Sequence, residues 1–154
     1  MRVLGFCMMK KEFYYAVLEG TKKEPVLTTD KGKVITLDSS NIPQFLNWYK
    51  NEINGLINKT KPEKVSYYLG LGIGGLKKDQ ILTSAFPIGV LNLVSYDFQL
   101  PVDSYTPSNL VMTKLGFPKD TDKDEVCNRI FGNNPPYWNK YLKKAILVAW
   151  FSLK

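Results

Sequence analysis

The sequence predicts one α/β domain, residues 1–154, with a mixed five-stranded sheet and helices on both of its faces. Three observations predict this fold class. The first 37 residues contain short alternating runs typical of antiparallel strands, helical periodicity begins after Leu37, and helical and strand-like segments then alternate to the end. A chain of this length is near the commonest size of a single domain.

Aromatic and β-branched residues concentrate in four short runs near the N-terminus. The runs are residues 3–6, 13–18, 25–27 and 34–37, separated by lysine and glycine residues that are typical of turns. We interpret them as three successive antiparallel strands.

The segment after Leu37 begins a helix. Asn41 can act as the N-cap, Pro43 suits the first turn, and Gln44 has the spacing of a capping-box partner. Pro62 ends the helical pattern. This helix is expected to cover one face of the sheet.

Two more strands alternate with the next helix. Residues 65–71 and residues 100–105 have the pattern of strands. Between them, residues 79–96 are mostly apolar but contain Pro87 and Gly89, which predicts a helix that is broken or begins late.

The C-terminal part is expected to hold three helical segments. Residues 106–116 contain a short helix, and the acidic residues from Asp122 onward favour the start of another that reaches residue 131. Residues 133–136, Asn-Asn-Pro-Pro, form a loop. Residues 138–153 place their apolar side chains on one stripe of an amphipathic helix.

Composition limits the function. A net charge of +7 suits a polyanionic partner, although 21 basic residues spread along the chain serve solubility equally well. The chain has no histidine, which removes the commonest general base and transition-metal ligand. Cys7 and Cys127 lack the spacing of a metal site, so we expect free buried thiols.

No signal peptide or spanning segment is recognisable, which predicts a cytoplasmic location without a membrane partner.

Residues 70–75 satisfy the pattern GxGxxG, and Asp97 follows at about the spacing of a dinucleotide site. A dinucleotide fold places these glycines after its first strand and opens directly into a helix, whereas here three strands come first and charged residues follow. We therefore interpret the glycines as a loop and expect no cofactor.

Residues 89–116, GVLNLVSYDFQLPVDSYTPSNLVMTKLG, resemble without a gap a segment of RuvC-type Holliday junction resolvases. In that family a helix end is followed by a strand through Leu-Pro-Val and by a helix after Tyr-Thr-Pro-Ser. Residues 121–126 resemble the family's next helix start, and residues 3–6 resemble its first strand. The resemblance implies a ribonuclease-H-like fold. The chain also resembles a small bacterial family of unknown function with RuvC-like architecture, which leaves the activity open.

The resemblance implies a nuclease site whose ligands this sequence lacks. Where RuvC-type resolvases carry four metal-binding carboxylates, the chain has Cys7, Tyr68, Tyr141 and Lys144. A pair of divalent ions requires a cluster of oxygen ligands, mostly carboxylates, and a lysine ammonium repels the ions. We therefore predict no catalytic residue, no metal site and loss of phosphodiester cleavage.

A nucleic acid, DNA or RNA, is the partner that the resemblance implies. The family carries a basic pair where this chain has Val111 and Met112, which weakens that inference. The candidate phosphate contacts, expected around the former catalytic groove, are Lys77, Lys78, Lys114, Lys123, Lys140, Lys143 and Lys144.

The favoured hypothesis is a catalytically inactive RuvC-like domain that binds nucleic acid through a basic groove. One alternative is a protein-interaction subunit or homodimer in which Cys7, Tyr68 and Tyr141 close the vestigial site. The other is a metal-dependent nuclease with relocated carboxylates, for which the candidates are Asp79, Asp97, Asp103 and Glu63.

Overall fold

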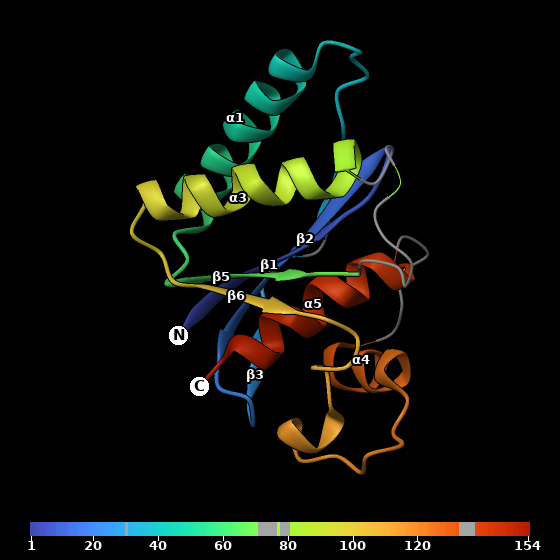
Figure 1. The fold of residues 1–154 in the computed structure, drawn as a ribbon. Coiled ribbons are helices and arrows are strands. Elements are labelled where there is room, and N and C mark those ends of the chain that lie inside the picture. Colours follow the sequence, from blue (N-terminus) through green and yellow to red (C-terminus); the bar gives the residue numbers. More distant parts are fainter. Residues whose placement is uncertain (30, 71–76, 78–80, 133–137) are drawn as a thin grey trace.

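The computed structural model describes residues 1–29, 31–70, 77, 81–132 and 138–154. Helices cover both faces of a mixed sheet (Figure 1). The strands are β1 (Arg2–Met8), β2 (Glu12–Gly20), β3 (Pro25–Leu27), β4 (Lys33–Ile35), β5 (Lys64–Tyr68) and β6 (Val102–Tyr105). The helices are α1 (Ile42–Thr60), the π-helical turn η1 (Ile81–Ala85), α3 (Phe86–Asp97), the 3-10 turn η2 (Met112–Leu115), α4 (Lys123–Phe131) and α5 (Lys140–Ser152).

The sheet has the topology that the sequence predicts. Its order is β3-β2-β1-β5-β6, with β2 antiparallel to β1 and β3, and with β5 parallel to both β1 and β6. The predicted third strand is two short strands, so the described residues form six strands rather than five. Both pieces pair with β2, β3 at its end and β4 at its start. Between the two pieces, the Val17 amide donates to the Thr29 hydroxyl at 2.9 Å.

Successive residues of β1 pack on opposite layers of helices, because side chains alternate across a strand. Leu4 and Phe6 belong to the core beneath α1 and α3. Val3 and Cys7 belong to the core that contains α5. Since both faces of β1 are covered, nearly all of this strand is buried.

The predicted helix starts are confirmed where the structure describes them. The Asn41 side chain accepts a hydrogen bond from the Gln44 amide at 3.0 Å to cap α1, and Asp122 accepts one from the Glu125 amide at 2.9 Å to cap α4. The late-starting helix is also confirmed, since the π-helical turn η1 precedes α3.

Two predicted boundaries differ from those in the structure, and a third predicted segment lies outside the described residues. The strand predicted to reach residue 71 ends at Tyr68, within the described part of the chain. The helix predicted over residues 106–116 is reduced to η2, which ends at Gly116 in the left-handed region (φ 82°). The predicted loop at 133–136 lies outside the described residues. No described helix combines the length and the hydropathy needed to cross a bilayer.

Candidate nucleic-acid interface

The carboxyl ends of β1 and β5 lie side by side because the two strands are parallel and adjacent. Cys7 lies near the end of β1, and Tyr68 is the last residue of β5. The first turns of α5 pack against this edge and add Tyr141 and Lys144. The structure thus brings together the four positions that the resemblance singled out.

Two tyrosine rings hold the Lys144 ammonium. Its Nζ atom lies 4.5 Å from the centroid of the Tyr68 ring and 5.4 Å from that of the Tyr141 ring. Contacts of this kind contribute about 0.5 to 2 kcal/mol each, depending on how far the cation is desolvated. Lys140, one turn earlier, places its Nζ 5.1 Å from the Tyr141 ring. The ammonium groups of Lys140 and Lys144 therefore both lie near the ring of Tyr141.

A polar network fixes the start of α5. The Asn139 side-chain oxygen accepts hydrogen bonds from the amides of Tyr141 (2.9 Å) and Leu142 (3.0 Å), and its amide group donates to the Tyr14 hydroxyl at 2.8 Å. The Tyr14 hydroxyl in turn donates to Glu12. This connection ties the residues that position Lys144 to β2.

Glu12, the carboxylate of this network, already has two partners within the protein. Glu12 accepts from Tyr14 and forms a 3.1 Å ion pair with Lys33, and these contacts lower its pKa. Burial, followed by the hydrogen bond to Glu12, raises the pKa of Tyr14 to about 12, so its phenol is neutral near pH 7.

The side chains at the four singled-out positions do not suit a divalent metal ion. Burial raises the pKa of the Cys7 thiol to about 12, against the opposing effect of the Lys144 charge, so the thiol stays protonated. The tyrosine and lysine side chains at this edge are also poor ligands for a hard cation, which prefers carboxylate and carbonyl oxygens. Among the described residues, no group of three or more His, Cys, Asp or Glu side chains is arranged to hold a metal.

A cavity of about 280 Å³ opens between α3 and α5 at this edge. Cys7 does not line this cavity, because its side chain is buried in the core that contains α5. The described lining contains two cations, four hydroxyls and no carboxylate; its residues are Met8, Met9, Lys10, Tyr68, Gly70, Thr83, Ser84, Ile88, Tyr141 and Lys144. We call this cavity the Lys144 groove. Sequence reasoning missed Lys10, Thr83 and Ser84, although Lys10 lies only two residues after the end of β1.

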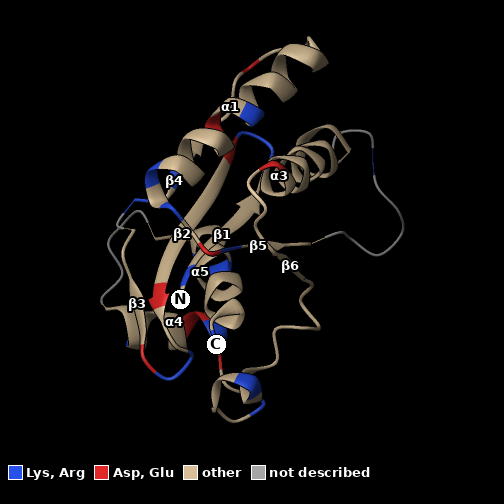
Figure 2. Cartoon of the chain, turned by 90° about the vertical axis from the view of Figure 1, so that its left-hand side faces the viewer, with Lys and Arg blue, Asp and Glu red and all other residues tan. Residues whose placement is uncertain are grey.

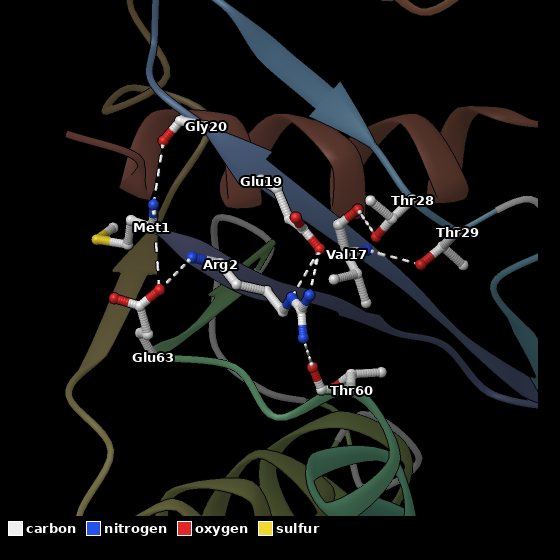
Figure 3. A network of polar contacts seen from close by, with 9 residues as sticks. All are labelled: Met1, Arg2, Val17, Glu19, Gly20, Thr28, Thr29, Thr60 and Glu63. Atoms are coloured by element: carbon white, nitrogen blue, oxygen red, sulfur yellow. Dashed lines mark hydrogen bonds and ion pairs between the residues drawn. The ribbon is translucent and has the colours of Figure 1, made fainter.

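The carboxylates considered as a relocated cluster lie apart. Glu63 accepts from the Arg2 amide at 2.9 Å, at the end of β1 opposite Cys7 (Figure 3). Asp103 accepts hydrogen bonds from Lys64 (2.8 Å) and Ser152 (3.1 Å), and it pairs with Ser66 in the middle of β5 rather than with Tyr68 at its end. Asp97 ends α3 and is exposed. Asp79 and most of the GxGxxG segment, residues 71–75, lie outside the described residues.

The candidate lysines do not form one surface. Lys140 and Lys144 meet at Tyr141, as described above. Lys77 is exposed just before η1, and Lys78 lies outside the described residues. Lys114 on η2 is exposed and Lys123 at the start of α4 is half-buried, and neither lines the Lys144 groove. Figure 2 shows basic residues on several elements, including α1 and the end of the chain.

The sequence analysis names Lys143 as a candidate phosphate contact, but the structure buries its side chain. Its side chain is only 9% exposed, which does not suit a phosphate contact. It lies on the side of α5 that faces α4, where its charge partly offsets the rise that burial causes in the pKa of Cys127, to about 12. The next residue, Lys144, faces the groove, because successive helical residues are rotated by about 100°.

Comparisons with known proteins identify the fold. No family model matches the sequence, and no curated protein matches it. Among solved structures, Thermus thermophilus RuvC in complex with Holliday junction substrate has a TM-score of 0.78 at 14% identity, covering 98% of this chain and 91% of that chain. Thermus thermophilus RuvC in another structure has a TM-score of 0.76 at 17% identity, covering 98% and 92%.

The yeast mitochondrial Holliday junction resolvase matches with a TM-score of 0.68 at 14% identity, covering 97% of this chain and 76% of that chain. Similarity at such low identity concerns the arrangement of the backbone and not the chemistry of the site. The chain therefore has the ribonuclease-H-like fold of RuvC-type resolvases, with a lysine between two tyrosines at the edge where Cys7 and Tyr68 meet.

Proposed function

We propose that this protein binds nucleic acid through the Lys144 groove and does not cleave it. The observation that carries the proposal is the Lys144 ammonium, held by the rings of Tyr68 and Tyr141 in a cavity that no described carboxylate lines. One of the similar structures is RuvC in complex with Holliday junction substrate, which supports a nucleic-acid partner for a chain of this fold. A cytoplasmic location stays a prediction from the sequence.

The electrostatics of the groove favour a phosphate over a metal ion. Lys10 and Lys144 line it, and Lys140 lies beside Tyr141. Each lysine that neutralises a phosphate releases condensed counterions from the nucleic acid. Ammonium-to-phosphate hydrogen bonds are charge-assisted and need no bridging ion. Catalysis by divalent metal ions, in contrast, needs a cluster of carboxylate ligands that these residues do not supply.

Titration of branched, duplex and single-stranded DNA and RNA tests the proposal. With three phosphate contacts, a fourfold rise in salt is expected to weaken binding to duplex roughly 40-fold, since each contact contributes about 0.9 to the slope of log K against log salt. Added magnesium or manganese is expected to produce no cleaved strands. Failure to bind any of these nucleic acids at low salt refutes binding, and metal-dependent cleavage by a clean preparation refutes inactivity.

A second candidate function, self-association, is favoured by the exposed face of α3. Phe86, Leu93 and Tyr96 are 39%, 60% and 79% exposed and lie at helical spacing along the face. Gly89 lies on the same face, and a Cβ there would meet nothing within 4 Å. Residues 81–96 contain no charged residue although the chain carries +7, so two copies can meet here without lysines opposing each other. An exposed apolar stripe of this kind marks an interface.

Replacing Leu93 with lysine is expected to abolish a homodimer formed through this face. Burial of one leucine contributes about 1.5 to 3 kcal/mol, and a twofold interface loses that contribution twice, which weakens the dimer by more than about 100-fold. Light scattering of the wild type and the variant measures the change. The matched control is Val26→Lys, because Val26 is 57% exposed on β3. A wild type that is monomeric at about 100 µM, a concentration at which weak specific dimers form, excludes this candidate.

A further inference from the structure

A second and more apolar cavity adjoins the Lys144 groove. It has a volume of about 480 Å³ and lies between β4, the start of α1 and η1. Lys10 and Thr83 line both cavities, so the two are adjacent. A ligand that binds in the groove and extends past these two residues reaches the second cavity.

The second cavity has an apolar wall that faces solvent. The wall consists of Ile35, Leu37, Ile42, Phe45 and Leu82. Ile35 is 74% exposed and Ile42 is 41% exposed, and with the other wall residues they form an exposed apolar patch of the kind that marks a binding site. The Phe45 ring is held edge-on against Tyr49, with ring centroids 5.0 Å apart, so this part of the wall is fixed.

Polar groups lie at the rim of the same cavity. The hydroxyls belong to Thr36, Ser39, Ser40 and Thr83, and the charged side chains are Lys10, Lys11 and Asp38. Ser39 is held in place, because its hydroxyl accepts from the Asn41 amide at 3.1 Å and donates to the Gln44 side chain at 2.9 Å. An apolar wall with a few hydrogen-bonding groups at its edge suits a flat uncharged ring with polar substituents.

We propose that this second cavity receives an unpaired nucleobase from the strand whose phosphate contacts the Lys144 groove. The inference rests on the proposed function and adds the class of nucleic acid to it. A base that is paired and stacked in a duplex cannot enter a side pocket without first being extruded, which is least costly where the base is already unpaired. The protein therefore selects bulges, branch points or single strands over uninterrupted duplex.

The lysines of the two adjacent cavities favour a base over an apolar segment of another protein. An occupant that spans both cavities lies beside the shared Lys10, and the groove adds Lys144. A nucleotide matches this arrangement, because it joins an anionic phosphate to an uncharged base. Contacts between bases and apolar or aromatic side chains contribute to affinity for every base type.

A duplex with one unpaired nucleotide tests this inference. The comparison probe is the same duplex with an abasic site at the unpaired position, which keeps the phosphates and removes the base. The wild type is expected to bind the probe with the base about tenfold more tightly. The variant with Ile35→Ser and Ile42→Ser is expected to bind both probes equally, and Val26→Ser, which removes an exposed apolar side chain from β3, is expected to keep the preference.

The outcomes separate the two proposals. Equal, salt-dependent binding of both probes by the wild type overturns the base pocket and leaves binding by the groove intact. A preference that survives in the double isoleucine variant also overturns the pocket, since the base then lies elsewhere. Loss of binding to every probe overturns the proposed function itself. Both isoleucines are exposed, and the wild-type comparison needs no variant, so the test does not depend on how the double variant folds.

Discussion

Replacing Lys144 with glutamine is expected to weaken nucleic-acid binding by about 10- to 100-fold. The change removes one charge-assisted contact to phosphate, and such contacts are worth about 1.5 to 3 kcal/mol. It also lowers the slope of log K against log salt by about 0.9, because one fewer phosphate is neutralised. Titrations at several salt concentrations measure both quantities at once.

The matched control is Lys50→Gln, an exposed lysine on α1. It removes the same charge from the chain, so it reports the effect of net charge alone, and its affinity is expected to stay within about twofold of the wild type. Equal losses in the two variants place the phosphate contacts outside the groove. Thermal unfolding checks that Lys144→Gln is folded, since the two ring contacts that it loses contribute only about 1 kcal/mol each.

The fold was predictable because each element carries a local signal. The Asn41 cap and the acidic residues from Asp122 onward predicted two helix starts, and the Pro87 segment predicted a helix that begins late. The split of the third strand was not predictable, because it depends on how Thr28, Thr29 and Gly32 approach β2. A Cβ at Gly32 would overlap the Tyr15 carbonyl, and no periodicity encodes such a contact.

The burial of Lys143 shows a second limit of the sequence. The apolar stripe of α5 predicts the side that meets the sheet, and Lys143 lies outside that stripe. The helix is nevertheless buried on most sides, because α4 packs against the side that the stripe leaves open. That arrangement depends on where residues 106–132 return in space, which the pattern of α5 does not contain.

The candidate site was predicted only in part. The resemblance placed Tyr68, Tyr141 and Lys144 together, and the structure agrees. Lys10 was interpreted as part of a turn, and Ser84 carried no signal, because both enter the groove from segments distant in sequence. Asn139 could have been found, since an asparagine before a helical stripe is a common N-cap.

Replacing Gly5 with alanine is expected to destabilise the protein by about 3 kcal/mol, the upper part of the usual range for an overpacked core. A Cβ at Gly5 would overlap the backbone oxygen of Ala145 and lie 2.9 Å from the Cβ of Ala149. The main obstacle is backbone, so rotation of a side chain cannot relieve it, and α5 must move away from β1. Urea denaturation measures the free energy of unfolding.

Gly55→Ala is the matched control. Gly55 is exposed inside α1, and a Cβ there would meet nothing within 4 Å. Alanine is favoured over glycine in a helix, so this variant is expected to be more stable than the wild type by up to about 1 kcal/mol. If both variants unfold at the same urea concentration as the wild type, the close approach of α5 to β1 at Gly5 is wrong.

The close approach at Gly5 also sets the geometry of the groove. Ala145 follows Lys144 directly, and the contact of Ala145 with Gly5 fixes how near α5 lies to β1 and, through it, to Tyr68 on β5. Moving α5 outward carries Lys144 away from the Tyr68 ring, which lies only 4.5 Å from its Nζ. Gly5→Ala is therefore expected to weaken nucleic-acid binding under conditions where the variant is still folded, whereas Gly55→Ala leaves binding unchanged. Unaltered affinity in a folded Gly5→Ala variant would show that the position of Lys144 does not depend on this contact.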